Sequence, residues 1–416
     1  MLNAFTWCDN ALCCEETPLA EIARSAGTPC YVYSRATLTE AYAAYVHAFA
    51  PLRPLLCYAC KANSNLAILN LFARLGSGFD IVSGGELARV LAAGGSASRV
   101  VFSGVGKSEA EIRFALEQGI LCFNVESAQE LDRIDRVAGD VGKIAPVSFR
   151  VNPDVDAGTH PYISTGLREN KFGVPHGEAP GLYRRARQLA HVRIVGIDCH
   201  IGSQITEPAP YVDALDRILD LVAQLSSDGI ELEHIDLGGG LGIRYRDETP
   251  LAPADYALAI GDRLAGRREQ LILEPGRSLV GNAGLLLTRI EYLKHGDARH
   301  FAVVDAAMND LMRPALYDAY HEVLPVRERG ASVPSRYDVV GPICESGDFL
   351  GRDRELAVAP GDLLAIMSAG AYGMSMSSNY NTRPRAAEVM ADGSNWHLIR
   401  SRESIAELFQ REQLLP

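Results

Sequence analysis

Short hydrophobic runs recur along the first two thirds of the chain, and each is bounded by Gly, Pro, Asn or Asp. Runs of about four to eight apolar residues between turn-forming residues are typical of buried strands. Eight runs fit this description, and we predict a strand at each. They begin at Leu55, Gly78, Arg99, Leu121, Ala145, Val192, His234 and Leu271.

Helix-like segments lie between most of these runs. Their apolar residues recur three and four positions apart, which gives a helix one apolar face. Strands that alternate with helices form right-handed parallel units. Eight such units favour a closed (β/α)8 TIM barrel, which we predict for residues 33–280. The predicted helices cover residues 66–76, 85–95, 108–119, 127–139 and 211–229.

One connection is longer than the others. Residues 154–190 join the fifth and sixth predicted strands and contain the stretch "STGLRENKFG". A long connection in a compact domain is often a lid or a binding loop, although it can also be a surface insertion without a role. The sequence leaves both interpretations open.

The alternation of strand-like and helix-like segments stops after Leu279. Six further strand-like segments follow with Pro and Gly between them, and long helices are missing. This pattern predicts a second, mainly antiparallel β domain made of residues 1–32 and 281–416, which a short helix within 403–415 closes. The strand-like segments cover residues 285–294, 299–308, 336–344, 362–372, 386–391 and 395–400.

Charge and hydropathy exclude several classes of partner. The chain has 416 residues, a formal net charge of −12 and a pI near 5.4. This acidity argues against binding to nucleic acid or to an anionic membrane, because both need a basic surface. No apolar run reaches the roughly 18 residues of a spanning helix, and the N-terminus lacks the basic region of a secretory signal. We therefore expect a cytoplasmic protein.

The nine cysteines are an odd number without regular spacing, so we expect free thiols. Cys57 and Cys60 form a C-x-x-C pair within the first predicted strand. A zinc site usually needs a second pair of ligands, and the sequence offers none at a suitable distance. We expect these two thiols to pack in the core, and we expect no metal site.

Reactive residues stand at several predicted strand ends. Lys61 ends the first strand and His200 ends the sixth. The glycines at 238–240 end the seventh, and the eighth ends in "EPGR", which contains Glu274 and Arg277. Because the reactive groups of a (β/α)8 barrel stand at the carboxyl ends of its strands, these residues should converge on one mouth.

An amine, a glycine loop and a carboxylate at one mouth suit pyridoxal 5'-phosphate (PLP). Glycine backbone can approach a phosphate closely. A lysine in a water-excluded site becomes a nucleophile toward an aldehyde, and a carboxylate can keep the pyridine nitrogen protonated. Taken singly, Lys61 could be a surface lysine on a turn, the glycines a simple turn, and His200 a satisfied core histidine.

A series of specific motifs runs from "TPCYVYS" at Thr28 to "NYNTRPRAAEV", which ends at Val389. Between them lie "YACKANSN", "GFDIVSGGEL", "HIGSQI", "DLGGGLGI", "EPGRSLV", "CESGD" and "AGAYGMSMSSNYN". In these motifs and in their order, the chain resembles the fold-type III, alanine racemase-like PLP decarboxylases. Within that group it is most similar to the diaminopimelate decarboxylases.

The resemblance implies a set of cofactor contacts. Lys61 would carry PLP covalently, Glu274 would pair with the pyridine nitrogen, and His200 would lie against the ring. The phosphate would rest on the glycine loop and on the backbone of residues 274–277. The other implied cofactor contacts are Asp80, Ser203, Gly239, Gly240, Gly276, Arg277 and Tyr372.

The implied reaction converts meso-2,6-diaminopimelate to L-lysine and CO2, the last step of lysine biosynthesis. Cys344 would be the catalytic proton donor, and its "CES" segment would come from the partner subunit of an obligate homodimer. The guanidinium groups of the substrate site suit a carboxylate, and Glu345 suits an amine. The implied substrate contacts are Arg277, Arg313, Tyr317, Glu345 and Tyr372.

Alternatives stay open at this point. A decarboxylase of the same fold could act on ornithine, arginine or carboxynorspermidine, although "CES" and Arg313 favour diaminopimelate. A racemase would need a tyrosine acid in place of Cys344, and a non-catalytic PLP carrier would lack the second domain. Considered alone, Arg313 could be an ordinary surface arginine and Cys344 a buried filler.

Overall fold

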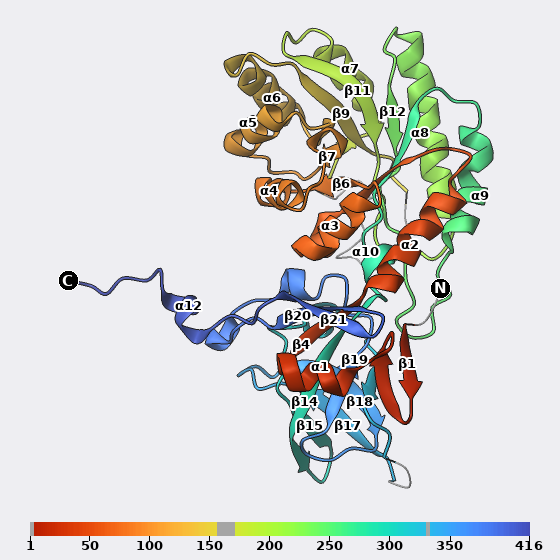
Figure 1. The fold of residues 1–416 in the computed structure, drawn as a ribbon. Coiled ribbons are helices and arrows are strands. Elements are labelled where there is room, and N and C mark those ends of the chain that lie inside the picture. The colour runs from red at the N-terminus through yellow and green to blue at the C-terminus, as the bar shows by residue number, and fades with distance from the viewer. Residues whose placement is uncertain (1–3, 156–170, 330–332) are drawn as a thin grey trace. The chain divides into compact units, whose positions relative to one another are not determined.

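The computed structural model describes residues 4–155, 171–329 and 333–416. The chain divides into two compact units, which we describe one at a time (Figure 1). The barrel unit comprises Tyr42–Ile243 and Thr249–Ser278. The β unit comprises Met1–Ala41, Arg244–Glu248 and Leu279–Pro416.

Eight parallel strands form the closed sheet of the barrel unit, as predicted. Each strand pairs with its neighbours along the order β9-β11-β12-β13-β5-β6-β7-β8, and a pairing of β8 with β9 closes the ring. The short strand β10 (Val174–Pro175) adds to β9 outside the ring. The ring strands are β5 (Leu55–Ala59), β6 (Gly78–Ile81), β7 (Val100–Phe102), β8 (Cys122–Val125), β9 (Ala145–Asn152), β11 (Val192–Asp198), β12 (His234–Asp236) and β13 (Gln270–Leu273).

Helices lie on the outside of this ring (Figure 1). All five predicted helices are present, and the side chains of Asn65, Ser83, Ser108 and Ser127 cap four of them. Two more helices that follow ring strands, α7 and α9, were not predicted. Pro180 and Gly181, which disfavour helix, lie within α7. In α9 the exposed Leu258 interrupts the pattern of one apolar face that predicts a helix. The helices are α3 (Leu66–Arg74), α4 (Gly84–Ala92), α5 (Glu109–Gln118), α6 (Ala128–Asp140), α7 (Ala179–Ala186), α8 (Ala209–Ser227) and α9 (Pro253–Leu264).

The β unit has one large, mainly antiparallel sheet with the order β18-β17-β15-β14-β4-β20-β21. Strand β19 pairs with β14 and β16 off this path, and β4–β20 and β15–β17 are the parallel pairs. The strands are β4 (Cys30–Ser34), β14 (Gly284–His295), β15 (His300–Val304), β16 (Val323–Pro325), β17 (Ser335–Val340), β18 (Phe349–Leu356), β19 (Leu363–Ile366), β20 (Ala387–Asp392) and β21 (Asn395–Arg400).

A small N-terminal sheet and several short helices complete the chain. The sheet contains β1 (Phe5–Cys8), β2 (Ala11–Cys14) and β3 (Thr17–Pro18), and its apolar side chains pack with α1 (Leu19–Ala26) and β4 in one buried cluster. The remaining helices are α2 (Arg35–Ala48), α10 (Arg277–Val280), α11 (Arg313–Tyr317) and α12 (Ile405–Phe409).

The predicted strands of the β unit correspond to β14, β15, β17, β19, β20 and β21, whereas β1 to β4, β16 and β18 were missed. Of these, β18 is the longest. Its sequence "FLGRDREL" has charged residues where a buried strand would have apolar ones. Pairing with β17 supplies the backbone hydrogen bonds that make it a strand all the same. The closing helix is also shorter than predicted, since α12 covers only Ile405–Phe409.

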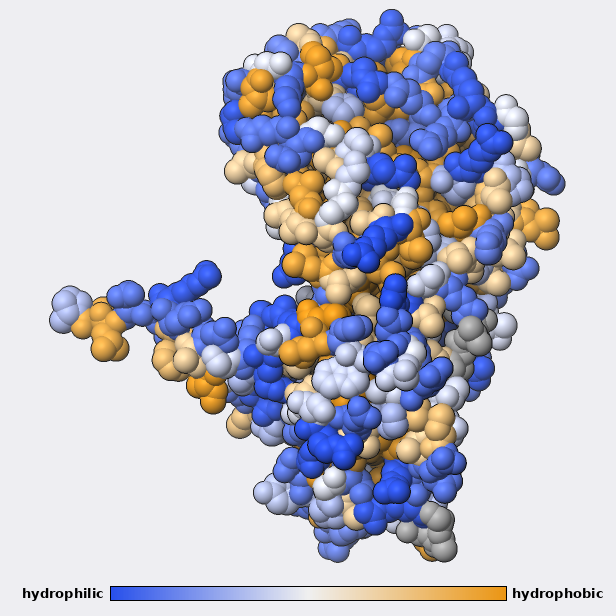
Figure 2. All heavy atoms as spheres, viewed as in Figure 1, coloured by the Kyte–Doolittle hydropathy of each residue, from blue (hydrophilic) through white to orange (hydrophobic). Residues whose placement is uncertain are grey.

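Hydrophilic residues cover most of the face that Figure 2 shows, with hydrophobic residues in small groups. Within the described residues, no helix is both long and apolar enough to cross a membrane. Exposed apolar side chains follow one another in the C-terminal segment after β21. These are Ile405, Phe409, Leu414 and Leu415.

Candidate active site

Lys61 stands in a tight turn that buried asparagines stabilise. The turn is one turn of 3-10 helix, Cys60–Ala62, so the lysine follows β5 rather than ending it. The hydroxyl of Tyr58 donates to the carbonyl oxygen of Asn63 at 2.8 Å. The Asn63 side chain accepts from the backbone N–H of Asn65 at 3.0 Å. The hydrogen bonds of Asn63 in "CKANSN" therefore fix the turn that holds Lys61 just beyond the strand.

The Lys61 amine faces a buried carboxylate. Its Nζ lies 2.7 Å from Oδ2 of Asp80, whose side chain is fully buried, while the lysine side chain keeps 35% of its exposure. The contact follows from the sheet, because Ala59 and Asp80 are paired residues of the parallel strands β5 and β6. Lys61 and Asp80 are thus brought together from different motifs.

Both cysteines of the neighbouring C-x-x-C pair are buried, one before and one after the end of β5. Cys57 lies in β5, but Cys60 begins the 3-10 turn, so the prediction that both lie in the strand was wrong. Burial raises the pKa of both thiols well above its usual value. Such thiols pack in the core instead of reacting.

The glycines after β12 allow the backbone to pass close to two other loops. A Cβ on Gly239 would lie 2.1 Å from the carbonyl oxygen of Glu274, and one on Gly240 would lie 2.4 Å from that of Gly202. Gly240 also has φ of +104°, which L side chains rarely adopt. After β13, a Cβ on Gly276 would lie 3.0 Å from the Ala59 side chain. No side chain fits at these positions, so bare backbone forms a cradle here.

Glu274 belongs to a cluster of buried carboxyl groups. Its oxygens and those of Asp198 and Asp236 lie within 4.8 Å of one another. Burial, reinforced by Asp236 and Asp80, raises the pKa of Glu274 well above its usual value. Burial raises the pKa of Asp236 to about 7, although the Gly238 N–H partly opposes it. Carboxyls this close can share protons or bind a cation, and the raised pKa values favour shared protons.

His200 is held as a neutral ring. Its Nδ1 accepts the backbone N–H of Gly239 at 3.2 Å. Burial lowers the pKa of His200 well below its usual value, and the cations of Arg150 and Lys61 lower it further. Two hydrogen bonds from the Arg277 guanidinium, the shorter 3.0 Å long, fix the hydroxyl of Ser203 near the same loop.

Three buried charged residues of this mouth were missed by the sequence analysis. Arg150 lies inside β9 and pairs with Glu126 at 3.3 Å. Asp198 ends β11 and Asp236 ends β12. The signal was present in "SFRVN", "GIDCH" and "HIDLGGG", where a charged residue interrupts an apolar run that should be covered on both faces.

The mouth fits PLP on its own chemistry. Lys61 offers the amine that PLP needs, and the glycine loop exposes backbone without side chains, which is the kind of surface that binds a phosphate. Glu274 Oε1 is buried and has no hydrogen-bond donor among the described residues. A buried acceptor of this kind suits the protonated ring nitrogen of the cofactor.

The other predicted site residues lie in the β unit. Arg313 and Tyr317 begin and end the short helix α11, four residues apart and so on one side of it. Arg313 is buried and its Nη1 lies 2.9 Å from His321 Nε2. Tyr372 has φ of +55°, an unusual backbone for a tyrosine, in the turn after "AGA".

Cys344 and Glu345 share one exposed loop. The Cys344 N–H donates to the side chain of Asn381 at 2.9 Å, and the hydroxyl of Tyr380 donates to Glu345. The buried Asp348 closes the loop by accepting the N–H of Ile343 at 2.8 Å. The "CESGD" motif therefore encodes a rigid loop that presents a thiol and a carboxylate at the surface of one chain.

The predicted binding loop around "STGLRENKFG" lies mostly outside the described residues. Its last residues are described: the Arg150 guanidinium lies 4.8 Å from the centre of the Phe172 ring, and Glu126 accepts the Gly173 N–H at 3.0 Å. These contacts attach the end of the connection to the barrel.

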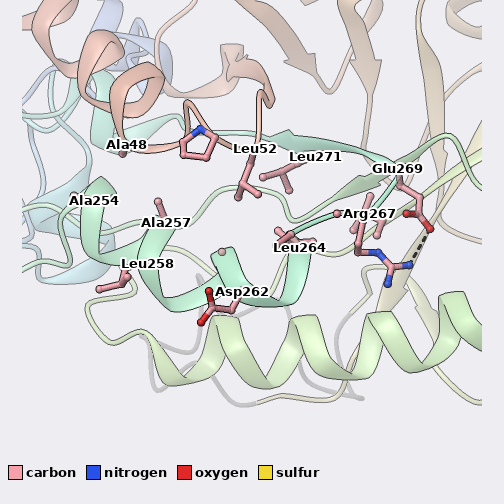
Figure 3. Close-up of a pocket in the computed structure, with 15 residues that line it drawn as sticks. Ala48, Leu52, Ala254, Ala257, Leu258, Asp262, Leu264, Arg267, Glu269 and Leu271 are labelled. Atoms are coloured by element: carbon pink, nitrogen blue, oxygen red, sulfur yellow. Dashed lines mark hydrogen bonds and ion pairs between the residues drawn. The ribbon is translucent and has the colours of Figure 1, made fainter.

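An open cavity of about 570 Å³ lies elsewhere on the barrel unit (Figure 3). Leu258 and other residues of α9 face Leu52 and Leu271 across it, and an ion pair of Arg267 with Glu269 stands at one side. Leu271 lies near the amino end of β13, whereas Lys61 and its neighbours follow the carboxyl ends of the strands. The largely apolar cavity is therefore separate from the reactive mouth.

Comparisons with known proteins agree with this geometry. The family "Pyridoxal-dependent decarboxylase, pyridoxal binding domain" matches residues 35–281. The diaminopimelate decarboxylase of Pseudomonas aeruginosa is 60% identical over 415 residues, which cover 100% of both chains. That of Neisseria meningitidis serogroup A is 60% identical over 401 residues, 96% of this chain and 98% of the relative.

Solved structures give the same result. Diaminopimelate decarboxylase from Helicobacter pylori, complexed with L-lysine, superposes with a TM-score of 0.91 at 43% identity, covering 95% of this chain and 99% of that one. The enzyme from M. jannaschii, also with L-lysine, gives 0.95 at 39% identity, covering 100% and 99%. From its barrel mouth and its full-length similarity, the chain belongs to the diaminopimelate decarboxylase family of pyridoxal-dependent decarboxylases.

Proposed function

We propose that the protein decarboxylates meso-2,6-diaminopimelate to L-lysine and CO2, as the last step of lysine biosynthesis. The observation that carries the proposal is the buried carboxylate mouth around Lys61, in a chain that is 60% identical over its whole length to a diaminopimelate decarboxylase. The protein is a PLP-dependent carboxy-lyase, and the substrate's identity is what needs an experiment.

The residues of the barrel mouth would hold PLP. Lys61 would bind it covalently, the backbone of Gly239, Gly240 and Gly276 would face its phosphate, and Glu274 would hold the proton of its ring nitrogen. When bound, PLP supplies an aldehyde that takes up an amine and a ring that accepts electrons from a breaking bond. Asp80, whose Oδ2 accepts from Lys61 Nζ at 2.7 Å, orients the amine at the mouth.

A proton must reach the carbon that loses its carboxylate. We assign this step to Cys344, whose Sγ–H would be transferred to that carbon as CO2 leaves. A thiol has an ordinary pKa near neutrality and can release its proton readily. Cys344 is exposed in a single chain, and exposed groups make poor proton donors to a dry site, so its loop needs to be covered by another surface.

This need supports a homodimer in which the "CES" loop of one subunit serves the site of the other. All nine cysteines are free thiols, which fits a cytoplasmic location.

The distal end of the substrate carries an amine and a carboxylate that do not react. We assign the carboxylate to Arg277 and Arg313, the amine to Glu345, and further contacts to Tyr317 and Tyr372. A substrate without the distal carboxylate would leave buried guanidinium donors unmatched, at a cost of about 1–3 kcal/mol for each. Ornithine and lysine should therefore react about ten- to a hundredfold more slowly.

The test is CO2 release from meso-diaminopimelate, ornithine, arginine, lysine and carboxynorspermidine, with the chirality of each product measured in parallel. The proposal expects CO2 from diaminopimelate and L-lysine as its product. Faster release from ornithine, arginine or carboxynorspermidine would identify the related decarboxylase instead. Inversion of an amino acid without CO2 would identify a racemase.

A further inference from the structure

The guanidinium group of Arg313 contacts two side chains of the β unit, His321 and Tyr245. Its Nη1 donates a hydrogen bond to Nε2 of His321 at 2.9 Å. Its central carbon lies 4.6 Å from the centre of the Tyr245 ring, a cation–π contact. Arg313 is only 7% exposed, so both contacts are shielded from water.

The hydrogen bonds of His321 determine its protonation state. Nδ1 lies 2.8 Å from the carbonyl oxygen of Met367, which can only accept, so Nδ1 carries a proton. Nε2 faces Arg313, which can only donate, so Nε2 carries a lone pair. His321 is therefore neutral, and a protonated ring would turn an N–H toward the guanidinium group.

His321 and Tyr245 are themselves fixed. His321 is fully buried, and its carbonyl oxygen accepts from Arg354 at 3.1 Å. The Tyr245 and His321 rings meet edge to face, with centroids 5.4 Å apart and an interplanar angle of 77°. The three side chains Arg313, His321 and Tyr245 come from separate segments and form one packed set, which we call the arginine clamp.

The chemistry of the clamp suits an arginine that must bind an anion. A carboxylate partner would orient the guanidinium group and also cancel its charge. A neutral imidazole and an aromatic face orient it without cancelling that charge. A side chain with as many rotatable bonds as arginine also loses less freedom on binding when it is already held.

We propose that His321 and Tyr245 are positioning residues that hold Arg313 in the orientation needed to bind the distal carboxylate of the substrate. This inference rests on the proposed function, in which Arg313 contacts that carboxylate. Neither His321 nor Tyr245 need touch the substrate, the cofactor or the reacting atoms.

The experiment uses a pair of ligands that differ by one group. L-lysine retains the distal carboxylate and amine of diaminopimelate, whereas cadaverine is lysine without the carboxylate. Their dissociation constants, measured on the PLP-loaded protein as inhibitors of CO2 release and by the change in cofactor absorbance, give a cadaverine/lysine ratio. Effects on cofactor loading or on the amine site largely cancel in this ratio.

Two pairs of variants separate positioning from folding. His321→Leu removes both hydrogen bonds, whereas His321→Gln can restore an acceptor and a donor. Tyr245→Leu removes the aromatic face, whereas Tyr245→Phe retains it. Tyr337→Leu is the matched control, since Tyr337 is a buried tyrosine of the same unit that packs against other histidines, His295 and His300.

We expect the cadaverine/lysine ratio to fall about tenfold in His321→Leu, which corresponds to about 1.4 kcal/mol. Tyr245→Leu should lower it in the same direction, while His321→Gln, Tyr245→Phe and Tyr337→Leu should stay near wild type. In the two leucine variants of the clamp, KM for diaminopimelate should rise more than kcat falls, and the cofactor absorbance should not change.

The outcomes separate the inference from the proposed function. If the wild-type protein binds lysine and cadaverine equally, the assigned recognition of a distal carboxylate fails, whatever the variants do. If wild type prefers lysine and both His321→Leu and Tyr245→Leu keep that preference, the clamp has no positioning role. Should His321→Leu not fold, the Tyr245→Leu and Tyr245→Phe pair decides the question alone.

Discussion

At the scale of single residues, the barrel mouth concentrates acids where a protein normally avoids them. Asp80, Asp198, Asp236 and Glu274 are all buried. Burying an unpaired carboxylate costs free energy, and pairing with a cation reduces this cost. The Lys61 amine pairs with Asp80 directly, and burial raises the pKa values of the other three acids, which makes a negative charge on them costly unless a cation lies nearby. A cationic ring nitrogen would complete this balance at Glu274.

Replacing Lys61 with alanine should abolish the covalent attachment of PLP. We expect the visible absorbance of the bound cofactor to be lost or shifted and CO2 release to fall below detection, because the amine and its charge both disappear. Lys143→Ala, which changes an exposed lysine of the same unit, should behave as wild type. Reduction with borohydride followed by peptide mapping checks the attachment, and cofactor on any other lysine contradicts it.

Sequence reasoning succeeded for residues whose role follows from their place along a strand. Lys61 and Glu274 were expected at the carboxyl ends of strands, and the structure has them just beyond those ends. It failed for Arg150 and Asp236, because their significance depends on which side chains face them inside the ring. His321 was missed for the same reason, since its partner Arg313 is near in sequence but its other contacts are not.

At the scale of elements, the loop between β12 and α9 owes its shape to missing side chains. Gly239 and Gly240 lie against the carbonyl oxygens of Glu274 and Gly202. Both contacts are with backbone, which cannot move aside as a flexible side chain could. The loop is therefore built to bring backbone close to backbone, and a phosphate would use the N–H groups that remain.

Gly239→Ala should weaken PLP binding while the barrel still folds. The added Cβ would come within 2.1 Å of the Glu274 carbonyl oxygen, so the loop and the start of "EPGR" must separate. We expect the dissociation constant of PLP to rise about tenfold or more. Gly261→Ala is the matched control, because nothing lies within 4 Å of its added Cβ and it sits in α9. Unchanged PLP affinity in Gly239→Ala would remove this loop as the phosphate site.

His234, the first residue of β12, is a buried histidine that should make the stability of the barrel depend on pH. Its ring packs over Gly196 of β11, where a Cβ would lie 2.1 Å from Nε2. Burial lowers the pKa of His234 from 6.5 to about 4. As pH falls, the unfolded chain binds the proton first, so the free energy of unfolding falls between pH 6.5 and about 4 and no further below that.

His234→Gln should flatten this pH dependence. The titrating group contributes at most roughly 3 kcal/mol across the window, since each pKa unit corresponds to about 1.4 kcal/mol. Urea unfolding of the barrel, followed at several pH values between 6.5 and 4, measures the slope. His47→Gln, an exposed histidine of the same unit, should leave the slope unchanged. A wild-type slope in His234→Gln would show that other groups control the acid sensitivity.

Hydrophobic periodicity predicted the elements of the barrel better than those of the β unit. All eight ring strands were expected, because a strand covered on both faces reads as a continuous apolar run. Strands β4, β16 and β18 were not: β16 has three residues and β18 is half-exposed, so neither has such a run, whereas β4 is fully buried but carries two tyrosines and a serine. Helices α7 and α9 were missed where Pro and Gly or an exposed leucine broke the pattern.

At the scale of the whole molecule, the β unit is assembled from segments that are distant in the chain, whereas the barrel unit is nearly continuous. The N-terminal strand β4 lies between β14 and β20 in the middle of the β sheet. Residues Arg244–Glu248, from a connection between barrel elements, belong to the β unit, and they contribute Tyr245 to the arginine clamp. The β unit therefore includes a short segment that lies, in the sequence, between two parts of the barrel unit.

Mixing two inactive variants tests the proposed sharing of sites between subunits. Lys61→Ala lacks the amine and Cys344→Ala lacks the proton donor, so each homodimer should be nearly inactive. After unfolding and refolding an equal mixture, heterodimers with one intact site should restore about a quarter of wild-type activity. The measurement is CO2 release, with each variant refolded alone as the control. No recovery in a mixture that does form dimers would mean that each site uses residues of one chain.

The amino-acid sequence by itself determined the order of strands and helices in the barrel, the change to a β-rich C-terminal part, and the placing of Lys61 and Glu274 at strand ends. These features are local, because periodicity and turn residues act over a few positions. Only the tertiary structure decided the central place of β4, the burial of the acids around Lys61 and the contact of Arg313 with Tyr245. Each of these depends on groups that meet through folding from distant parts of the chain.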